Sequence, residues 1–304
     1  MTPRKRRPSA RQRLQTATDV TRSGARRYPR HFFTTLRGGN GDVREVFRIA
    51  ARRAKDSTFS AVWLGHATIL LRIGERWILT DPVFSRRIGI KLGPVTVGME
   101  RQLPAVDPAT LPPIDLVLIS HAHFDHLDRP SLRRLASPTT KVLTAASTSD
   151  LIPGGFEKVT ELGWGEHIDL GEIVIRALRP EHWGARAIWD RHRGYNSYLI
   201  ETPHKRVLFA GDTAYCDAFD RVAGVDLAVF GIGAYDPWIA KHANPEQVWA
   251  MATAADAQHL LPMHHSTFEL SDEPREEPLL RLRAAAGKDA RRIVACDLGT
   301  LWTP

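Results

Sequence analysis

Short apolar runs separated by turn residues dominate the chain from Phe59 onward. Thr68–Ile73 and Trp77–Thr80 are mainly apolar, and the polar pair Glu75-Arg76 between them is typical of a turn, so the pattern predicts a β-hairpin. The run Asp115–Ser120 is short, apolar and β-branched. A run of this kind is typical of a strand covered on both faces.

Strands and helices are expected to alternate further along the chain. Asn244 as a cap and Pro245 in the first turn predict a helix over Pro245–Ala257. Pro130, near the start of Arg129–Ala136, likewise predicts a helix over that segment. The segment 81–113, rich in Pro and Gly, is expected to be an excursion from the sheets. Further strands are predicted at Lys141–Thr144, Glu172–Leu178, Ser197–Glu201, Arg206–Ala210, Leu227–Phe230 and Arg292–Ala295, and a short basic helix at Val43–Ala54.

Hairpins followed by strand–helix alternation predict sheets packed together with helices outside. The chain has 304 residues, 43% of them hydrophobic and 25% charged, which is typical of a globular protein and excludes disorder throughout. We expect one domain over residues 58–304 and a basic extension over residues 1–57, partly mobile.

Charge is distributed unevenly between these two parts. Residues 1–57 hold 16 Lys and Arg against 4 Asp and Glu, a net charge of +12, whereas the remainder holds 26 against 30, a net charge of −4. A basic arm of this kind can touch anionic lipid or nucleic acid, or it can be a solvated tail. Phe32 and Phe33 in the arm can rest on a membrane or pack on the domain.

Two cysteines, Cys216 and Cys296, imply no disulfide framework. No apolar run reaches the length of a membrane span, and no signal-peptide pattern follows the N-terminal arginines. We therefore expect a cytoplasmic protein, with peripheral contact at the inner membrane face through the arm as an option. The sequence leaves the oligomeric state open.

The chemistry of the chain is concentrated in His121-Ala-His123-Phe-Asp125-His126, where an apolar strand ends. Imidazole and carboxylate groups are ligands of Zn²⁺, and a loop after a buried strand can aim several of them at one point. Fe²⁺ or Mn²⁺ can occupy similar sites. Neither cysteine lies in the motif, so a cysteine ligand is not expected.

The motif His-x-His-x-Asp-His resembles that of the metallo-β-lactamase superfamily, and the resemblance extends over roughly residues 59–300. It implies an α/β fold, an αββα sandwich of two β-sheets with helices on the outer faces. It also implies two zinc ions per chain, with His121 and His123 on one ion and Asp125 and His126 on the other.

The resemblance also implies three later ligands. His182 follows the apolar run that ends at Leu178, and Asp212 in a Gly-Asp turn is expected to bridge both ions. The last ligand is His264 or His265, and the pattern His-x-x-Thr-Phe favours His264.

Within the superfamily the chain resembles the branch of N-acylphosphatidylethanolamine-hydrolysing phospholipase D. The segments that carry this resemblance are Trp63-Leu-Gly-His66-Ala-Thr, Leu79-Thr-Asp81-Pro-Val-Phe84-Ser, His182-Trp183, Ile232-Gly-Ala-Tyr235 and His264-His-Ser-Thr-Phe268. His66 and Asp81 are expected to fix the ligands without binding metal themselves.

The resemblance implies a phosphodiesterase of the phospholipase D type that acts on a phospholipid or another small molecule. Two metal ions sharing a water generate hydroxide near neutral pH, which attacks phosphorus or a carbonyl carbon. Asp125 and Asp212 are the candidate catalytic residues. Tyr235, His242 and His265 are candidate substrate contacts, although Tyr235 and Trp238 are also compatible with ordinary packing.

Three alternatives stay open. The first is a lactonase or sugar-phosphate hydrolase of the same fold. The second is a nuclease or nucleic-acid-binding protein, which is disfavoured because the arm lacks interleaved aromatic residues and a known RNA module. The third is a metal site without catalytic activity, which the filled ligand positions disfavour.

Overall fold

The computed structural model describes residues 53–54, 56–93, 95–187 and 190–304. Arg53 and Ala54, at the end of the predicted helix Val43–Ala54, are helical. The rest of that helix, the Phe32-Phe33 pair and nearly all of the basic arm lie outside the described residues. The division of the chain at residue 57 therefore stays a prediction.

The first sheet has seven strands, which lie side by side in the order β15 (Leu301–Trp302), β1 (Phe59–Trp63), β2 (Ile69–Ile73), β3 (Arg76–Thr80), β6 (Leu116–Ile119), β7 (Lys141–Ala145) and β8 (Lys158–Leu162). β1, β2 and β3 are antiparallel neighbours, whereas β3, β6, β7 and β8 run parallel. The early hairpin and the buried strand that the sequence predicts over Asp115–Ser120 are confirmed.

The second sheet has six strands in the order β14 (His259–Met263), β13 (Leu227–Gly231), β12 (Arg206–Phe209), β11 (Ser197–Glu201), β10 (Val174–Leu178) and β9 (His167–Asp169). Its first three strands run parallel and the others pair antiparallel. A separate two-stranded sheet consists of β4 (Arg87–Leu92) and β5 (Val95–Glu100).

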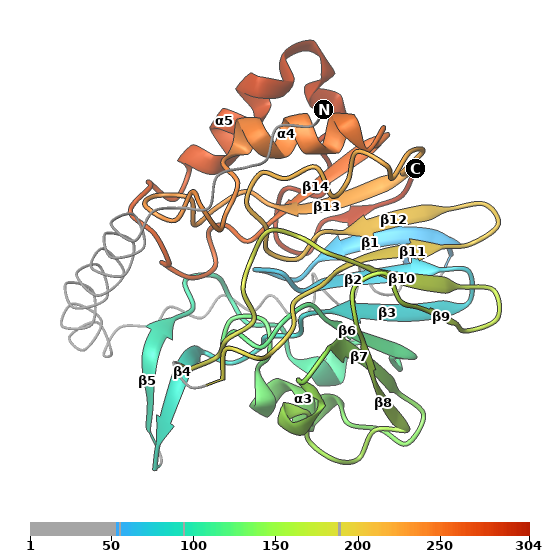
Figure 1. Ribbon diagram of the computed structural model, residues 1–304, viewed down its shortest axis with the longest axis vertical. Coiled ribbons are helices and arrows are strands. Elements are labelled where there is room, and N and C mark those ends of the chain that lie inside the picture. The colour runs from blue at the N-terminus through green and yellow to red at the C-terminus, as the bar shows by residue number, and fades with distance from the viewer. Residues whose placement is uncertain (1–52, 55, 94, 188–189) are drawn as a thin grey trace, which may run out of the picture.

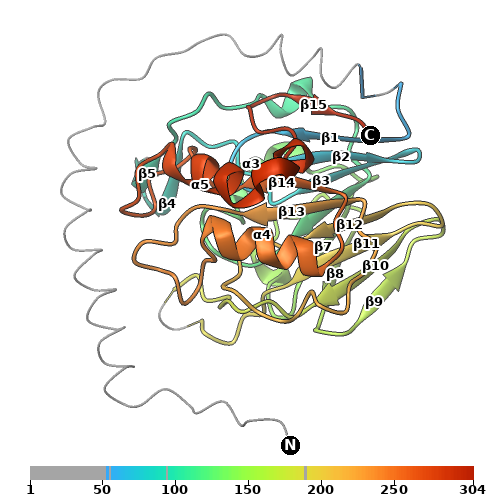
Figure 2. The same cartoon turned by 90° about the horizontal axis from the view of Figure 1, so that it is seen from above.

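The two large sheets pack face to face with helices outside them, as Figures 1 and 2 show. Leu71 of the first sheet and Tyr198 and Phe209 of the second belong to one buried cluster between the sheets. Burial of such side chains supplies most of the favourable free energy of folding. The predicted αββα sandwich is confirmed.

Helices cover the outer face of each sheet. α3 (Arg129–Leu135) buries Leu132 in a cluster with residues of the first sheet, and α4 (Pro245–Ala254) and α5 (Glu277–Ala286) cover the second sheet. Asn244 caps α4 as predicted, because its side chain accepts a hydrogen bond from the Gln247 amide. Three short 3₁₀ helices, η1 (Pro108–Thr110), η2 (Ser149–Leu151) and η3 (Gly287–Arg292), lie in the connections.

The structure corrects the predicted closing strand at Arg292–Ala295. Ile293 forms only an isolated bridge with Leu260, and Ala295 has a φ of 50°, which an extended strand does not allow. The closing strand is β15, beside β1. The helix predicted to reach Ala257 ends at Ala254, because Asp256 has a φ of 49°.

The segment 81–113, predicted as an excursion, contains the β4–β5 hairpin. The sequence pattern also did not predict the strands β8, β9 and β14 or the helix α5. In β14 the reason is Pro262, which a strand tolerates at the edge of a sheet, and β14 is such an edge strand.

Candidate metal centre

The histidine-rich motif lies in the loop that directly follows β6, whose four residues are all buried. The backbone of His121 forms a bridge with Tyr195, and the Ser120 carbonyl accepts a hydrogen bond from the Asn196 amide. The loop is thus attached to the second sheet as well as to the first. The other candidate ligands follow β10, β12 and β14, so both sheets contribute to one site.

Four side chains form a first group of metal donors. His121 Nε2 lies 2.8 Å and His182 Nε2 3.5 Å from His123 Nδ1. Asp212 Oδ2 lies 3.8 Å from His121 Nε2 and 3.6 Å from His182 Nε2. Donors bound tetrahedrally at about 2.0–2.1 Å lie about 3.3 Å from one another. The spacing of this group therefore fits one tetrahedrally bound metal ion.

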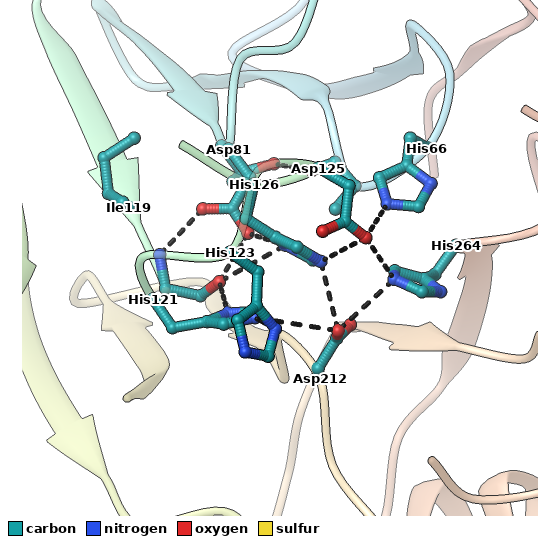
Figure 3. Close-up of polar contacts among 12 residues, drawn as sticks. His66, Asp81, Ile119, His121, His123, Asp125, His126, Asp212 and His264 are labelled. Carbon is teal, nitrogen blue, oxygen red and sulfur yellow. Dashed lines mark hydrogen bonds and ion pairs between the residues drawn. The ribbon is translucent and has the colours of Figure 1, made fainter. Parts of the chain in front are cut away.

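A second group of donors lies beside the first (Figure 3). Asp125 Oδ2 lies 3.5 Å from His126 Nε2 and 3.3 Å from His264 Nε2. Asp212 Oδ2 lies 3.1 Å from the former nitrogen and 3.2 Å from the latter. These distances again match the spacing of donors around one ion.

Asp212 is the side chain that the two groups share. Its Oδ2 atom lies within 4 Å of ring nitrogens from both groups. The preceding Gly211 has a φ of 59°, and a Cβ atom there would lie 2.9 Å from the Ser120 Cβ. Glycine at this position lets the Asp212 turn approach the histidine loop closely. The carboxylate thus lies where it can bridge two ions.

The second ring nitrogen of three candidate ligands, His121, His126 and His182, is held by the protein. Asp81 Oδ2 accepts a hydrogen bond of 2.7 Å from His126 Nδ1 and one of 2.5 Å from the Ser120 hydroxyl. Ser120 Oγ lies 2.9 Å from His121 Nδ1, and His182 Nδ1 donates to a backbone carbonyl, that of Lys241, over 3.1 Å. Such bonds fix the tautomer, so that Nε2 points to the metal. The structure thus places Asp81 behind two ligands.

The electrostatics of the site favour metal binding. Burial lowers the pKa of His121 and His182 well below the usual value and that of His123 to about 4. These imidazoles are therefore neutral, which is the form that binds a metal ion. Burial also disfavours charge on His126, but the nearby carboxylates hold its pKa well above the usual value.

The carboxylates respond in the opposite way. Burial alone would raise the pKa of Asp125 and Asp212, but neighbouring histidines hold both well below the usual range. Burial opposes charge on His264 too, yet Asp212 and Asp125 raise its pKa to about 9. Two buried carboxylates thus draw positive charge into the site, and divalent cations can supply it.

Several polar atoms of the centre have no hydrogen-bond partner although they are buried. Among the described residues these include His126 Nε2, Asp212 Oδ1 and His264 Nε2. Buried polar atoms without partners are costly, and metal coordination removes the cost. The protein therefore contains His and Asp clusters that are able to bind metal.

His66 lies in the second group but serves Asp125. Its Nε2 lies 3.0 Å from Asp125 Oδ2, and its carbonyl accepts bonds from the Trp63 indole and the His264 amide. Burial lowers the pKa of His66 to about 3, so the neutral ring donates to the carboxylate. His66, Asp81 and His264 all have positive φ, which costs about 1 kcal/mol or more each and is typical of functional sites.

A sequence model described as the beta-lactamase superfamily domain matches residues 76–265, which include all seven predicted ligands. The chain belongs to the metallo-β-lactamase superfamily.

Relatives within the superfamily are similar over most of the chain. An uncharacterized protein of Mycobacterium tuberculosis is 32% identical over 247 residues, which cover 77% of this chain and 66% of that protein, just under two thirds of its length. N-acyl-phosphatidylethanolamine-hydrolyzing phospholipase D 1 of Caenorhabditis elegans is 28% identical over 81% of this chain and 76% of its own. The crystal structure of a possible metal-dependent hydrolase from Veillonella parvula matches with a TM-score of 0.64 and 14% identity, over 82% of this chain and 100% of that one.

Two of the three predicted substrate residues lie at the candidate metal centre. His242 Nδ1 lies 3.9 Å from Asp212 Oδ2, and the His242 ring lies beside those of His182 and His264. His265 stacks on Trp63 at a centroid distance of 4.6 Å, and burial lowers its pKa to about 4. His264 rather than His265 faces the two carboxylates.

The third predicted residue, Tyr235, is engaged elsewhere. Its hydroxyl donates to Glu277 over 2.8 Å, and its ring lies under the Arg281 guanidinium. These contacts fit the packing alternative, and a substrate role for Tyr235 stays a prediction.

The sequence assigned no role to two residues of the centre. Arg186 Nη1 donates to the carbonyls of Ala122 and Leu127 over 2.9 and 2.7 Å, so it clamps the histidine loop from a distant part of the chain. Trp183 stacks on His182, and 36% of it is exposed. The sequence holds no local signal for Arg186, whereas Trp183 stood beside a predicted ligand.

A pocket of about 440 Å³ lies beside the candidate metal centre. His264 and His265 line it on the metal side, and Phe268, Leu270 and Pro278 add apolar surface. A small molecule, or part of a larger one, can enter it next to the candidate ligands.

Proposed function

We propose that the chain is a metal-dependent hydrolase with two zinc ions, and that it cleaves a phosphodiester of N-acylphosphatidylethanolamine-like phospholipids. The observation that carries the proposal is Asp212, whose carboxylate oxygen faces both donor groups at 3.1 to 3.8 Å. A centre of two ions suits phosphodiester cleavage, because both the attacking and the leaving oxygen need stabilisation.

In the proposed centre each side chain has a distinct part. His121, His123 and His182 would hold the first ion, and Asp125, His126 and His264 would hold the second, with Asp212 shared between them. Metal ions bound there supply Lewis acidity and make water acidic enough to yield hydroxide near neutral pH.

The second ring nitrogens and the buried carboxylate of Asp81 keep the donor atoms aimed at the centre. His66 holds Asp125 in the same way.

Two histidines are proposed to contact the substrate. Burial lowers the pKa of His242 to about 4, so the neutral ring can donate a hydrogen bond to a phosphate oxygen beside Asp212. His265 lines the adjoining pocket, where it can contact the remainder of the molecule.

The similarity to the Caenorhabditis elegans phospholipase D supports a lipid substrate. No helix in the described part of the chain has the length and apolarity to cross a membrane. Peripheral contact of the basic arm with a bilayer, as part of a cytoplasmic location, belongs to the same proposal.

The test is elemental analysis of metal in protein purified without chelator, combined with three assays on the same sample. The substrates are bis(p-nitrophenyl) phosphate, N-acylphosphatidylethanolamine and a simple lactone. We expect about two zinc ions per chain and cleavage of the phosphodiester and the lipid. His123→Ala should abolish both activities, and Glu75→Ala at an exposed turn serves as the control.

Lactone cleavage alone would replace the phosphodiesterase proposal by a lactonase of the same fold. Less than one metal ion per chain after supplementation, without activity, would overturn the dinuclear centre.

A further inference from the structure

The β4–β5 hairpin stands apart from both large sheets. Its two strands pair only with each other among the described strands. Figures 1 and 2 show the hairpin at the edge of the molecule, apart from the two large sheets. A hairpin alone is marginally stable in water, so a projecting one of this length calls for a reason.

One face of the hairpin is apolar. Ile88 lies opposite Met99, and Ile90 lies opposite Val97, so these four side chains share a face with Val95. Ile88 is buried at the base, whereas 56% of Ile90 and 58% of Val95 are exposed. Large apolar side chains exposed side by side are typical of a contact surface.

This apolar face continues into the pocket beside the metal centre. Ile88 and Met99 belong to one cluster with Phe268 and Leu270, and the latter two also line the pocket. Arg101 at the end of β5 forms a backbone bridge with Phe268. The base of the apolar face is thus joined, through the cluster around Phe268, to the lining of the pocket that His264 also lines.

The other face is polar, and the hairpin is basic. Arg87, Lys91, Thr96 and Glu100 lie on this face. Residues 86–100 contain three Arg and Lys (86, 87 and 91) against one Glu, a net charge of +2, whereas Arg101 beyond β5 is buried. Apolar side chains flanked by basic ones match the interface of a bilayer that contains anionic lipid.

We infer that the β4–β5 hairpin docks on a phospholipid bilayer, with Ile90 and Val95 inserted among the lipids. This orientation would hold the bilayer beside the pocket, whose lining shares Phe268 and Leu270 with the cluster at the base of the hairpin. The inference extends the proposed lipid hydrolase, and the membrane contact itself is independent of the reaction.

The test compares the full-length metal-loaded protein with the double variant Ile90→Glu and Val95→Glu. Binding is measured by sedimentation with vesicles of phosphatidylcholine mixed with phosphatidylglycerol, at low and at high salt. High salt screens attraction by the basic arm, whereas apolar insertion persists. The control is Leu280→Glu, which alters a residue of α5 that is 64% exposed.

We expect the double variant to lose at least about tenfold in vesicle binding at high salt. It should hydrolyse bis(p-nitrophenyl) phosphate as the unaltered protein does, because neither residue contacts the metal centre. Leu280→Glu should change neither measurement. Vesicle binding without turnover of any lipid would support the docking surface and contradict the proposed reaction.

Equal vesicle binding by the double variant and the unaltered protein would overturn the inference. Light scattering of the same samples measures whether the apolar face instead binds a second copy of the chain. If the unaltered protein is a dimer that the double variant cannot form, and vesicle binding is unchanged, the apolar face belongs to a second copy of the chain.

Discussion

Asp81 shows how a residue outside the ligand set shapes the metal centre. It is fully buried, and burial raises its pKa. It nevertheless accepts hydrogen bonds from the Ser120 amide, the Ser120 hydroxyl and His126 Nδ1. Because Ser120 in turn contacts His121, one carboxylate orients a ligand from each donor group.

Replacement of Asp81 by Asn should weaken metal binding about 10- to 100-fold with the fold retained. The amide keeps an oxygen for the Ser120 backbone, but it cannot bind the His126 proton as a carboxylate does. Zinc affinity is measured by competition with a chelator of known affinity. Asp115→Asn is the matched control. Asp115 directly precedes β6, and its carboxylate accepts a hydrogen bond from the Trp77 amide. Equal affinities for both variants would disprove the orienting role of Asp81.

Metal binding should release protons and strengthen with pH. The pKa of His264 is about 9 in the metal-free protein, raised chiefly by Asp212 against the effect of burial, so the ring is protonated at neutral pH. A metal ion must displace this proton. The zinc affinity should therefore rise about tenfold per pH unit for each displaced proton, and the contribution of His264 should level off above about pH 9.

Calorimetric titration in two buffers of different ionisation enthalpy counts the released protons. The variant Asp125→Asn, which removes one of the carboxylates that raise the pKa of His264, should release fewer protons. Zinc binding at neutral pH without proton release would contradict the protonated state.

At the scale of elements, strand ends position the chemistry. The candidate ligands follow β6, β10, β12 and β14, and His66 and Asp81 follow β1 and β3. Parallel neighbours such as β12, β13 and β14 end at the same edge of their sheet. Loops at that edge are free to vary while the strands keep their register.

The β4–β5 hairpin depends on a pair of glycines, Gly89 and Gly98, which lie opposite each other. A Cβ atom at Gly98 would lie 1.9 Å from the Ile88 carbonyl oxygen, so the strands cannot approach as they do with any other residue there. Gly98→Ala should therefore distort the hairpin at a cost of about 1–3 kcal/mol.

Hydrogen exchange of the amides of residues 87–100 should become faster in this variant, and vesicle binding should fall with it. Gly154→Ala provides the comparison, because no atom lies within 4 Å of a Cβ atom added there. Unchanged protection of the hairpin amides in Gly98→Ala would contradict the prediction that the hairpin requires glycine at this position.

At the scale of the molecule, the metal centre joins the two sheets. His121 and Asp125 extend from the first sheet, and Asp212 and His264 extend from the second. Metal bound between them would hold together two layers that otherwise meet through the apolar cluster. Binding to the folded state alone stabilises it.

Removal of the metal with a chelator should lower the melting temperature by roughly 10 °C, as expected for about 4 kcal/mol in a domain of this size. Calorimetry with and without chelator measures the change. Asp212→Asn, which alters the shared ligand, should show a much smaller difference. A melting temperature that does not respond to chelator in the unaltered protein would mean that the centre contributes nothing to the cohesion of the sheets.

The sequence alone determined the layered fold and the ligand candidates. Apolar runs such as Asp115–Ser120 identify buried strands locally, and the spacing of His121 to His126 is a local motif. Asn244 and Pro245 likewise marked the start of α4, because capping depends on neighbouring residues only. Such features depend on short-range chemistry that a linear sequence preserves.

Tertiary structure alone decided which histidines face which carboxylate, and where the closing strand lies. His66 contacts Asp125 across 59 positions, and β15 pairs with β1 from the other end of the chain. The sequence did not predict the β4–β5 hairpin, because a segment rich in glycine and proline is typical of a loop. In the structure its glycines allow two strands to approach closely. Distances between remote residues are set by packing of the whole chain, and local patterns do not encode them.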